Sequence, residues 1–385
     1  MKPSSQTSSP PNISENPNNH QEVLNTIRSK TKDILSSLSS SSLLTDDSII
    51  SWLEPTDNAT LPPSATDHCR NFHHNGFLHL PQFCIDREIL AMKAQMEELV
   101  DEQWHPGAKT TASFRTDEGQ IKAQGNNDYF LDSAARIHFF AEVDALDDDG
   151  CLKEEYKIDK LTALNKSGHG LHVTPGAFHS YATSDKICSL VESLGYVDPV
   201  IPQSMYIFKQ ARIGGVVTSH QDSTFLYTTP RQTCLGLWLA LDDATLENGC
   251  LWVRPKSHRE PLRRRFSRND AYFTLKDPDA PKMIMESLPH DNDVPWDGGI
   301  PKQDEEGSRH EAMVLWDAGF VPIECRAGDL VVFPGTLDHL SLANKSGGAR
   351  HTFQLHLVEG PGAGVVWEGS NWLQYPEGME FLSIK

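Results

Sequence analysis

The hydrophobic pattern of the second half of the chain is that of short β-strands. In residues 235–241, leucines at the odd positions alternate with Gly236, Trp238 and Ala240, which is the two-residue period of a strand with two distinct faces. Gly, Pro and Asn residues between the apolar runs indicate turns. The pattern predicts strands at Gly76–Phe83, Met205–Lys209, Gly215–Thr218, Thr233–Leu241, Cys250–Arg254, Asp329–Phe333, Thr352–Val358 and Gly364–Trp367.

Helical spacing of apolar residues precedes most of these strands. Residues 88–100 carry an apolar stripe along one helix face, and Asp86 is placed to cap the first turn. Residues 184–194 form a second predicted helix, with Ser184 as its N-cap and Gly195 as its end. With helices only upstream of many short strands, the chain is predicted to be mostly β with flanking helices (α+β), around a β-sandwich or jelly-roll core.

Composition divides the chain near residue 66. Residues 1–66 are rich in Ser, Pro and Asn and cannot bury enough apolar surface to order themselves, so we expect a disordered tail and linker. Residues 67–385 are expected to form one domain, in which 259–320 is a long insertion between strands. Apolar residues near helical spacing indicate one helix within the tail, either a marginal helix or one that docks on a partner: Val23, Leu24, Ile27, Ile34, Leu35 and Leu38.

Charge and cysteine content exclude several classes of protein. The formal net charge of −19 lacks the basic footprint of a nucleic-acid binder and does not suit an anionic membrane surface. No apolar run reaches the roughly 18 residues of a membrane span, and the first residues do not resemble a secretory signal. The 7 cysteines are scattered without a CxxC pair, which argues against a disulfide framework or zinc ribbon and favours a reducing, cytoplasmic setting.

A His-x-acid pattern begins at His20, His220 and His258. With 17 His and 53 Asp or Glu among 385 residues, about two such patterns arise by chance, so the pattern alone is weak. Only His220-Gln-Asp222 directly follows a Gly-rich predicted strand, on which residues i and i+2 share one face. Two imidazoles and one carboxylate on one side of iron(II) leave the other side open, and this pair could supply two of the three ligands.

Two residues further along the chain strengthen this interpretation. His339 follows a turn and the predicted strand at 329–333, and Arg350 comes eleven residues later at the start of another predicted strand. A buried arginine beside a metal ion needs an anion, and its planar fork suits a carboxylate such as the far carboxylate of 2-oxoglutarate. The alternative is a surface histidine and arginine around a hairpin.

Longer stretches of the sequence carry a family resemblance. Two of them are Gln203-Ser-Met-Tyr-Ile-Phe-Lys-Gln210 and His220-Gln-Asp-Ser-Thr-Phe-Leu-Tyr227, and the others are 76–83, 165–169, 235–252, 255–258 and 371–374. On these stretches the chain resembles the phytanoyl-CoA dioxygenase family across residues 67–376, which leaves out the tail.

The resemblance implies a fold and a metal-dependent reaction. The family fold is a double-stranded β-helix, a cupin-like jelly roll, in agreement with the predicted strands. The implied iron(II) ligands are His220, Asp222 and His339, and the expected reaction consumes 2-oxoglutarate and O₂ and releases succinate and CO₂. Family-like halogenases replace the carboxylate ligand by a small residue, so Asp222 favours hydroxylation of a small organic or acyl substrate. The alternatives are a catalytically silent sensor of 2-oxoglutarate or metal, and a zinc hydrolase with the same ligands.

The resemblance also implies a co-substrate pocket. Its implied residues are Arg350, which would bind the far carboxylate of 2-oxoglutarate, Ser341 beside it, and Lys166, Met205 and Trp238 along the pocket. From the residues alone, the lysine could be solvated, the serine a turn hydroxyl, and the methionine and tryptophan ordinary strand core.

The chain departs from the family pattern at three places: the tail, the length of 259–320, and Lys256, where glycine is common. The family name suggests an acyl-CoA substrate, and the arginines at 263–265 could contact CoA phosphates, although a solvated basic turn is the simpler interpretation. The sequence identifies neither the substrate nor the oligomeric state.

Overall fold

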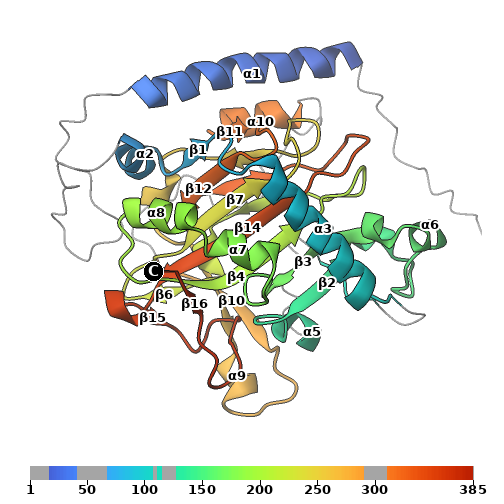
Figure 1. The fold of residues 1–385 in the computed structure, drawn as a ribbon, viewed down its shortest axis with the longest axis vertical. Helices are drawn as coiled ribbons and strands as arrows, with labels where there is room; N and C mark the ends of the chain where they lie inside the picture. Colours follow the sequence, from blue (N-terminus) through green and yellow to red (C-terminus); the bar gives the residue numbers. More distant parts are fainter. Residues whose placement is uncertain (1–16, 41–66, 107–110, 115–126, 290–309, 385) are drawn as a thin grey trace, which may run out of the picture.

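Two antiparallel sheets form the core of the domain in the computed structural model, which describes residues 17–40, 67–106, 111–114, 127–289 and 310–384 (Figure 1). The major sheet has the order β1-β12-β7-β14-β4-β3-β2, with β16 paired to β4. Its strands are β1 Leu78–Leu80, β2 Ile137–Ala141, β3 Leu164–His169, β4 Pro199–Ile207, β7 Leu235–Ala240, β12 Leu330–Pro334, β14 Thr352–Glu359 and β16 Leu382–Ser383. The minor sheet has the order β11-β8-β13-β5, from β5 Val217–His220, β8 Leu251–Val253, β11 Val321–Ile323 and β13 His339–Ser341. The predicted jelly roll is confirmed.

The alternation along β7 separates two hydrophobic layers. Leu237 and Leu239 pack into a buried cluster that contains the helices on the outer face of the major sheet. Trp238, on the opposite face, belongs to a second cluster that includes Leu251 and Leu340 of the minor sheet. One face of β7 therefore packs against helices and the other faces the second sheet, as a two-residue period requires.

Helices cover the outer face of the major sheet (Figure 1): α3 Asp86–Gln103, α7 Ala177–Ala182 and α8 Asp185–Ser193. Helix α8 begins after Ser184 and is followed by Gly195 at φ +95°, so both predicted ends are confirmed. The prediction that Asp86 caps α3 was wrong. The N-cap is Ile85, whose backbone N–H donates to the Glu88 carboxylate at 3.0 Å, and Asp86 occupies the first helical turn.

The segment 259–320 has secondary structure of its own. Its described elements are the paired strands β9 Arg264–Arg268 and β10 Met283–Ser287 and the helices α9 Asp270–Phe273 and α10 Glu311–Asp317, while residues 290–309 lie outside the described residues. The prediction that helices occur only upstream was therefore wrong. Helices of 4 and 7 residues are too short to display a helical period in the sequence.

Buried charge explains the arginine at the start of this segment. Arg263 is 7% exposed, and its Nη1 donates to Oδ2 of the fully buried Asp338 at 2.9 Å. Arg254 contacts the same carboxylate. A buried carboxylate is strongly destabilising unless cations compensate it. The interpretation as a solvated basic turn was therefore wrong for Arg263, although Arg264 is exposed.

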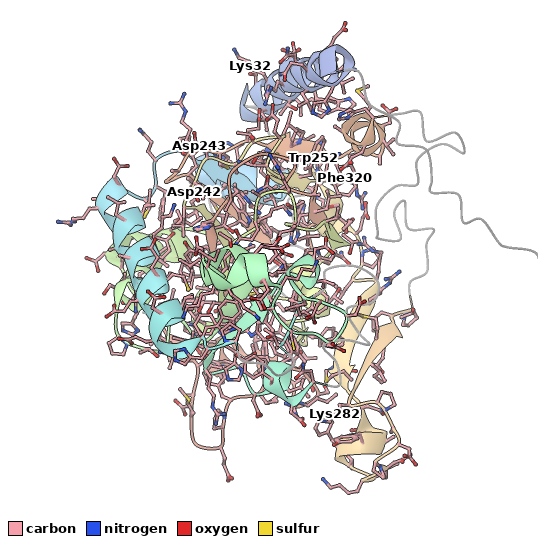
Figure 2. All side chains as sticks on the ribbon, turned by 90° about the vertical axis from the view of Figure 1, so that its right-hand side faces the viewer. Lys32, Asp242, Asp243, Trp252, Lys282 and Phe320 are labelled. Atoms are coloured by element: carbon pink, nitrogen blue, oxygen red, sulfur yellow. The ribbon has the colours of Figure 1, made fainter. Side chains whose placement is uncertain are left out.

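Helix α1 (Pro17–Ser40) packs against α10 at one end of the molecule (Figure 1). Its Leu24 and Ile27 are buried in the same hydrophobic cluster as Trp252 and Phe320, which Figure 2 shows below this helix. The apolar spacing in the sequence indicates this helix, and the structure shows which surface it contacts. Neither α1 nor any other helix in the described ranges has the length and apolar character needed to cross a membrane.

An ion-pair network reinforces the contact of α1. The Arg28 guanidinium lies 2.8 Å from a carboxylate oxygen of Glu247 and 2.8 Å from one of Glu324. All three side chains are about one-third exposed, so the network contributes less than its geometry suggests. The rest of the predicted tail, 1–16 and 41–66, lies outside the described residues, and the domain boundary near residue 66 stays a prediction.

We expect acid to destabilise the fold through buried histidines. His172 is fully buried, and the surrounding protein lowers its pKa to about 4, chiefly by desolvation, with His179 adding to the effect. Between this pKa and the unfolded value of about 6.5, the unfolded chain binds more protons, so lowering the pH favours unfolding. From pH 7 to pH 5 this group alone should cost about 2 kcal/mol of unfolding free energy, measurable by urea denaturation.

The variant His172→Gln isolates this contribution. It removes the titrating imidazole, so its unfolding free energy should depend less steeply on pH than that of the wild type. An equal pH slope in the two proteins would show that His172 is not the group responsible.

Candidate metal centre and adjoining cavity

Strand pairing in the minor sheet brings together two predicted ligands from distant parts of the sequence. His220 ends β5 and His339 begins β13, and they are register partners with ring centroids 4.2 Å apart. Asp222 opens a 3-10 turn, and its Oδ1 lies 3.4 Å from Nε2 of His220 and 3.6 Å from Nε2 of His339. The expectation that Asp222 shares a strand face with His220 was wrong, because β5 ends at His220 and the turn brings the carboxylate to the imidazoles.

Hydrogen bonds fix the orientation of all three side chains. The Nδ1 atoms of His220 and His339 donate to the carbonyl oxygens of Thr218 and Leu337, at 2.8 and 3.1 Å. Both Nε2 atoms are therefore acceptors and face the carboxylate. Oδ2 of Asp222 accepts from Nε2 of His356 at 3.2 Å, which leaves Oδ1 turned toward the two imidazoles. Partners of this kind orient the ligands of metal sites in proteins.

The electrostatic environment keeps this group ready to bind a cation. Burial alone would raise the pKa of Asp222, but the imidazoles of His339, His356 and His220 hold that pKa well below its usual value. Desolvation, together with the neighbouring His220, lowers the pKa of His339 to about 4, so its imidazole is neutral near pH 7. The pKa of His220 is raised, because the attraction of Asp222 outweighs desolvation.

The spacing of the ligand atoms suits one metal ion. Nitrogen and oxygen ligands about 2.1 Å from an ion lie about 3.0–3.4 Å apart. The separations of 3.4 and 3.6 Å from Asp222 Oδ1 are close to this range. Gly236 leaves the space for this carboxylate, because a Cβ there would lie 3.2 Å from Asp222 Oδ2 and 2.9 Å from the Phe333 ring. Two imidazoles and a carboxylate form the facial set that binds iron(II).

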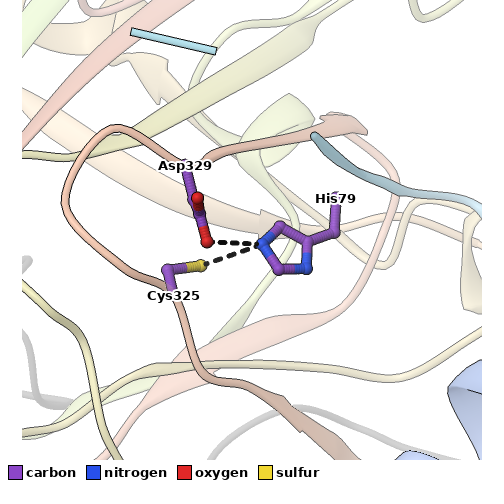
Figure 3. A group of neighbouring side chains, drawn as sticks. All are labelled: His79, Cys325 and Asp329. Carbon is purple, nitrogen blue, oxygen red and sulfur yellow. Dashed lines mark hydrogen bonds and ion pairs between the residues drawn. The ribbon is translucent and has the colours of Figure 1, made fainter. Parts of the chain in front are cut away.

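A second cluster of possible ligand atoms lies near the start of β12 (Figure 3). Nε2 of His79 is 3.0 Å from Oδ2 of Asp329 and 3.8 Å from Sγ of Cys325. Asp329 also accepts backbone N–H bonds from Gln82 and Arg326, each at 2.9 Å. These bonds join the turn after β1 to the turn before β12, and burial raises the pKa of the Cys325 thiol, so we interpret the cluster as a structural link.

The His–Asp–His cluster opens into a cavity of about 330 Å³ that also contains Arg350. Arg350 is 3% exposed, and its Nε and Nη1 have no hydrogen-bond partner within the part of the chain that the structure describes. Its guanidinium lies 5.3 Å from the centre of the Trp238 ring. Desolvation lowers the pKa of Arg350 only to about 10, so the group is charged at neutral pH. A buried, charged guanidinium with unused donors fits an anionic ligand.

Sequence comparison places the chain in a family. A sequence model described as phytanoyl-CoA dioxygenase (PhyH) matches residues 72–352. Phytanoyl-CoA dioxygenase 1 of Oryza sativa subsp. japonica is 39% identical over 317 residues, which cover 82% of this chain and 96% of that protein. Phytanoyl-CoA dioxygenase domain-containing protein 1 of Rattus norvegicus is 39% identical over 318 residues, with 82% and 96% covered. The chain belongs to the phytanoyl-CoA dioxygenase family.

Similarity extends to solved structures at lower sequence identity. The epimerase SnoN in complex with Fe3+, alpha ketoglutarate and nogalamycin RO aligns with a TM-score of 0.48 and 17% identity, over 81% of this chain and 90% of that one. The apo form of EctD from S. alaskensis aligns with a TM-score of 0.46 and 15% identity, over 82% of each chain.

In this member of the phytanoyl-CoA dioxygenase family, every residue of the implied co-substrate pocket lines the cavity: Lys166, Met205, Trp238, Ser341 and Arg350. Ser341 Oγ donates to the Gly249 carbonyl at 2.9 Å, and its hydroxyl is buried. Lys166 is 3% exposed, so the alternative of a solvated lysine was wrong. Its Nζ lies 3.1 Å from His169 Nε2 and 3.3 Å from the centre of the Phe114 ring, and desolvation lowers its pKa well below the usual value.

Several polar residues of the cavity escaped the sequence analysis. His356 orients Asp222, and the ionisable side chains of Glu142 and Lys209 line the cavity with Arg350. One signal was available for His356: polar residues at 354 and 356 alternate with apolar ones in β14, which marks a polar strand face inside the barrel. Glu142 directly follows β2, and Lys209 lies two residues after the end of β4. No local pattern in the sequence distinguishes the two from surface residues. Lys256 has φ +69°, which agrees with glycine being common at that position.

Proposed function

We propose that this chain is an iron(II)- and 2-oxoglutarate-dependent dioxygenase that hydroxylates a small organic or acyl substrate. One observation carries the proposal: a single cavity contains both an oriented His–Asp–His cluster and a buried guanidinium with unused donors. The cluster suits iron(II), and the guanidinium suits the far carboxylate of 2-oxoglutarate. Membership in the phytanoyl-CoA dioxygenase family supports the same reaction class.

Each residue of the cavity has a role in this proposal. His220, Asp222 and His339 hold the metal, and His356 keeps one carboxylate oxygen of Asp222 turned toward it. Arg350 binds the co-substrate at its far end. The residues that line the co-substrate on the way to the metal are Ser341, Trp238, Met205 and Lys166. The bound ion, 2-oxoglutarate and O₂ supply the oxidising chemistry, with release of succinate and CO₂, and the protein orients and shields them.

Asp222 supports hydroxylation within this reaction class. Its carboxylate occupies the ligand position that a small residue leaves vacant in related halogenases, and Gly236 provides the room for it. An anion from solution would have to displace a buried carboxylate that three imidazoles stabilise. We also propose a cytoplasmic location, in keeping with the absence of disulfides among the 7 cysteines, all of which lie in the described ranges.

The proposal is tested by succinate release from 2-oxoglutarate. Iron-loaded protein should produce succinate in the presence of O₂ and none in its absence. Without the organic substrate, the O₂-dependent production of succinate should be slow but measurable. Tight binding of 2-oxoglutarate without succinate would indicate a sensor instead, and O₂-independent hydrolysis by zinc-loaded protein would indicate a hydrolase. A library of acyl thioesters and small carboxylic acids, screened for faster succinate release, would then identify the substrate class.

A further inference from the structure

The cavity wall near Arg350 contains two more buried ionisable side chains. Lys209 and Glu142 are 3% and 4% exposed, and both line the same cavity as Arg350. They come from different parts of the fold: Lys209 follows β4, and Glu142 follows β2. Neither belongs to the metal cluster, and the proposed reaction assigns neither a role.

Backbone contacts place Lys209 beside the residues proposed to bind the far carboxylate. The backbone N–H of Arg350 donates to the Lys209 carbonyl at 3.2 Å. The stem of Lys209 lies against Gly249, where a Cβ would come within 2.4 Å of Lys209 Cε. Ser341 donates to the carbonyl of the same glycine at 2.9 Å. Lys209 thus contacts the backbone of Arg350 and packs against Gly249, whose carbonyl Ser341 binds.

The donors and acceptors in this wall are incompletely used. An ammonium group has three N–H donors, and Lys209 Nζ donates to the Gly215 carbonyl at 2.7 Å. Glu142 is a carboxylate whose charge acts on this ammonium group. Glu142 accepts from Asn165 through Oε2 at 3.0 Å, and the Gly215 backbone also acts on this carboxylate, whereas no side-chain donor in the described ranges bonds to Oε1. Buried groups of this kind normally find partners, so the unused donors indicate a ligand.

The charges of the wall suit one additional carboxylate. Desolvation and the nearby Arg350 lower the pKa of Lys209 to about 7, while Glu142 opposes this shift. Desolvation likewise raises the pKa of Glu142 to about 7. With one proton between them, Lys209 and Glu142 are either oppositely charged or both neutral, and in both cases their charges sum to zero. Arg350 then leaves the wall with one positive charge. A single entering carboxylate would neutralise it, and its charge would favour the protonated, cationic form of Lys209.

We propose that Lys209 is a second cationic contact for the far carboxylate of the co-substrate, acting with Arg350, and that it strengthens the preference for a dicarboxylic 2-oxo acid. Glu142 is the counter-charge that makes a buried lysine tolerable before the ligand enters. This inference rests on the proposed function. The inference adds Lys209 as a residue that recognises the far carboxylate of the ligand. Lys209 does not recognise the 2-oxo acid group at the other end of the ligand.

A comparison of two ligands tests the inference directly. Binding of 2-oxoglutarate and of 2-oxopentanoate, which lacks the far carboxylate, is measured calorimetrically with anaerobic iron-loaded protein. Lys209→Met should weaken 2-oxoglutarate binding about tenfold to a hundredfold, the range expected for a charged hydrogen bond. Binding of 2-oxopentanoate should change less than about twofold, because that ligand never contacted the lysine. Lys186→Met, which removes a lysine paired with Glu88 outside the cavity, should change neither.

A double variant controls for misfolding, because Lys209→Met alone leaves the buried carboxylate of Glu142 without a compensating cation. Glu142→Gln with Lys209→Met leaves no unpaired charge of this pair and should show the same selective loss for 2-oxoglutarate. Equal losses for both ligands, or unchanged 2-oxoglutarate affinity, would overturn the inference. If the wild-type protein itself does not bind 2-oxoglutarate, the proposed function fails instead, so the two failures are distinguishable.

Discussion

Replacing Asp222 by alanine should abolish turnover and greatly weaken binding of iron(II). The carboxylate is the only anionic member of the cluster in the described part of the chain, and both Nε2 atoms of His220 and His339 face its Oδ1. A catalytic metal contributes several kcal/mol to the reaction, so succinate release should fall by roughly a thousandfold or more. Equilibrium dialysis with iron(II) under anaerobic conditions measures the metal, and succinate release measures the reaction.

The chain provides a matched control for this variant. Glu22 belongs to another His-x-acid pattern but is exposed on α1, so Glu22→Gln should leave iron binding and succinate release unchanged. Thermal unfolding of the Asp222→Ala protein checks that the fold survives, since the loss of the carboxylate also removes a partner of His356. Turnover within about tenfold of the wild type, with normal iron content, would show that Asp222 is not a required ligand.

The strands that could be predicted from the sequence are those with one apolar face. β7, β12 and β14 alternate or run apolar over at least five residues, and their predicted positions overlap the observed ones. The missed strands include β2, β3, β9, β10, β11 and β13. β3 has the polar sequence Leu-Asn-Lys-Ser-Gly-His, and β13 has only three residues, of which two are polar and face the cavity. Residues that serve a site break the local apolar pattern, which explains why β3 and β13 were missed, although β5, which ends at His220, was predicted.

The candidate site shows the same division between local and distant information. His220 and Asp222 are close in sequence, and their pattern was visible but near chance level. His339 joins them only because β13 pairs with β5, a pairing that no local pattern encodes. His339 was a candidate because it follows a turn and a predicted strand, with Arg350 eleven residues later, and the family resemblance then implied it as the third ligand. The resemblance did not supply Lys209 or Glu142, whose importance depends on their being buried together in one wall of the cavity.

Net charge describes the surface of this protein and not its cavity. The formal charge of −19 argues against nucleic acid as a partner, yet the described cavity walls hold the buried basic side chains Lys166, Lys209 and Arg350, of which Arg350 is charged at neutral pH. Solvent screens surface carboxylates, whereas charges inside a cavity act on a ligand at low dielectric. An acidic protein can therefore bind an anionic co-substrate, provided that the cations are buried with it.

Replacing Arg350 by alanine should raise the requirement for 2-oxoglutarate while iron binding stays normal. The guanidinium is buried, charged and lines the cavity, and its planar fork of N–H donors can bind the far carboxylate in a bidentate manner. Loss of one member of a buried ion pair costs about 3–5 kcal/mol, which predicts a KM for 2-oxoglutarate more than about a hundredfold higher. Iron affinity should be unaffected because Arg350 is not among the clustered ligands.

Arg350→Lys separates the charge of this residue from its shape. Lysine keeps the positive charge but lacks the planar fork, so its KM should lie between those of the wild type and of Arg350→Ala. A lysine variant as impaired as the alanine variant would mean that bidentate geometry, and not charge, determines affinity. Unchanged KM in Arg350→Ala would remove this residue from the co-substrate site. The far carboxylate would then have to be bound by the other buried basic side chains of the cavity, Lys209 or Lys166, whose methionine variants can be assayed in the same way.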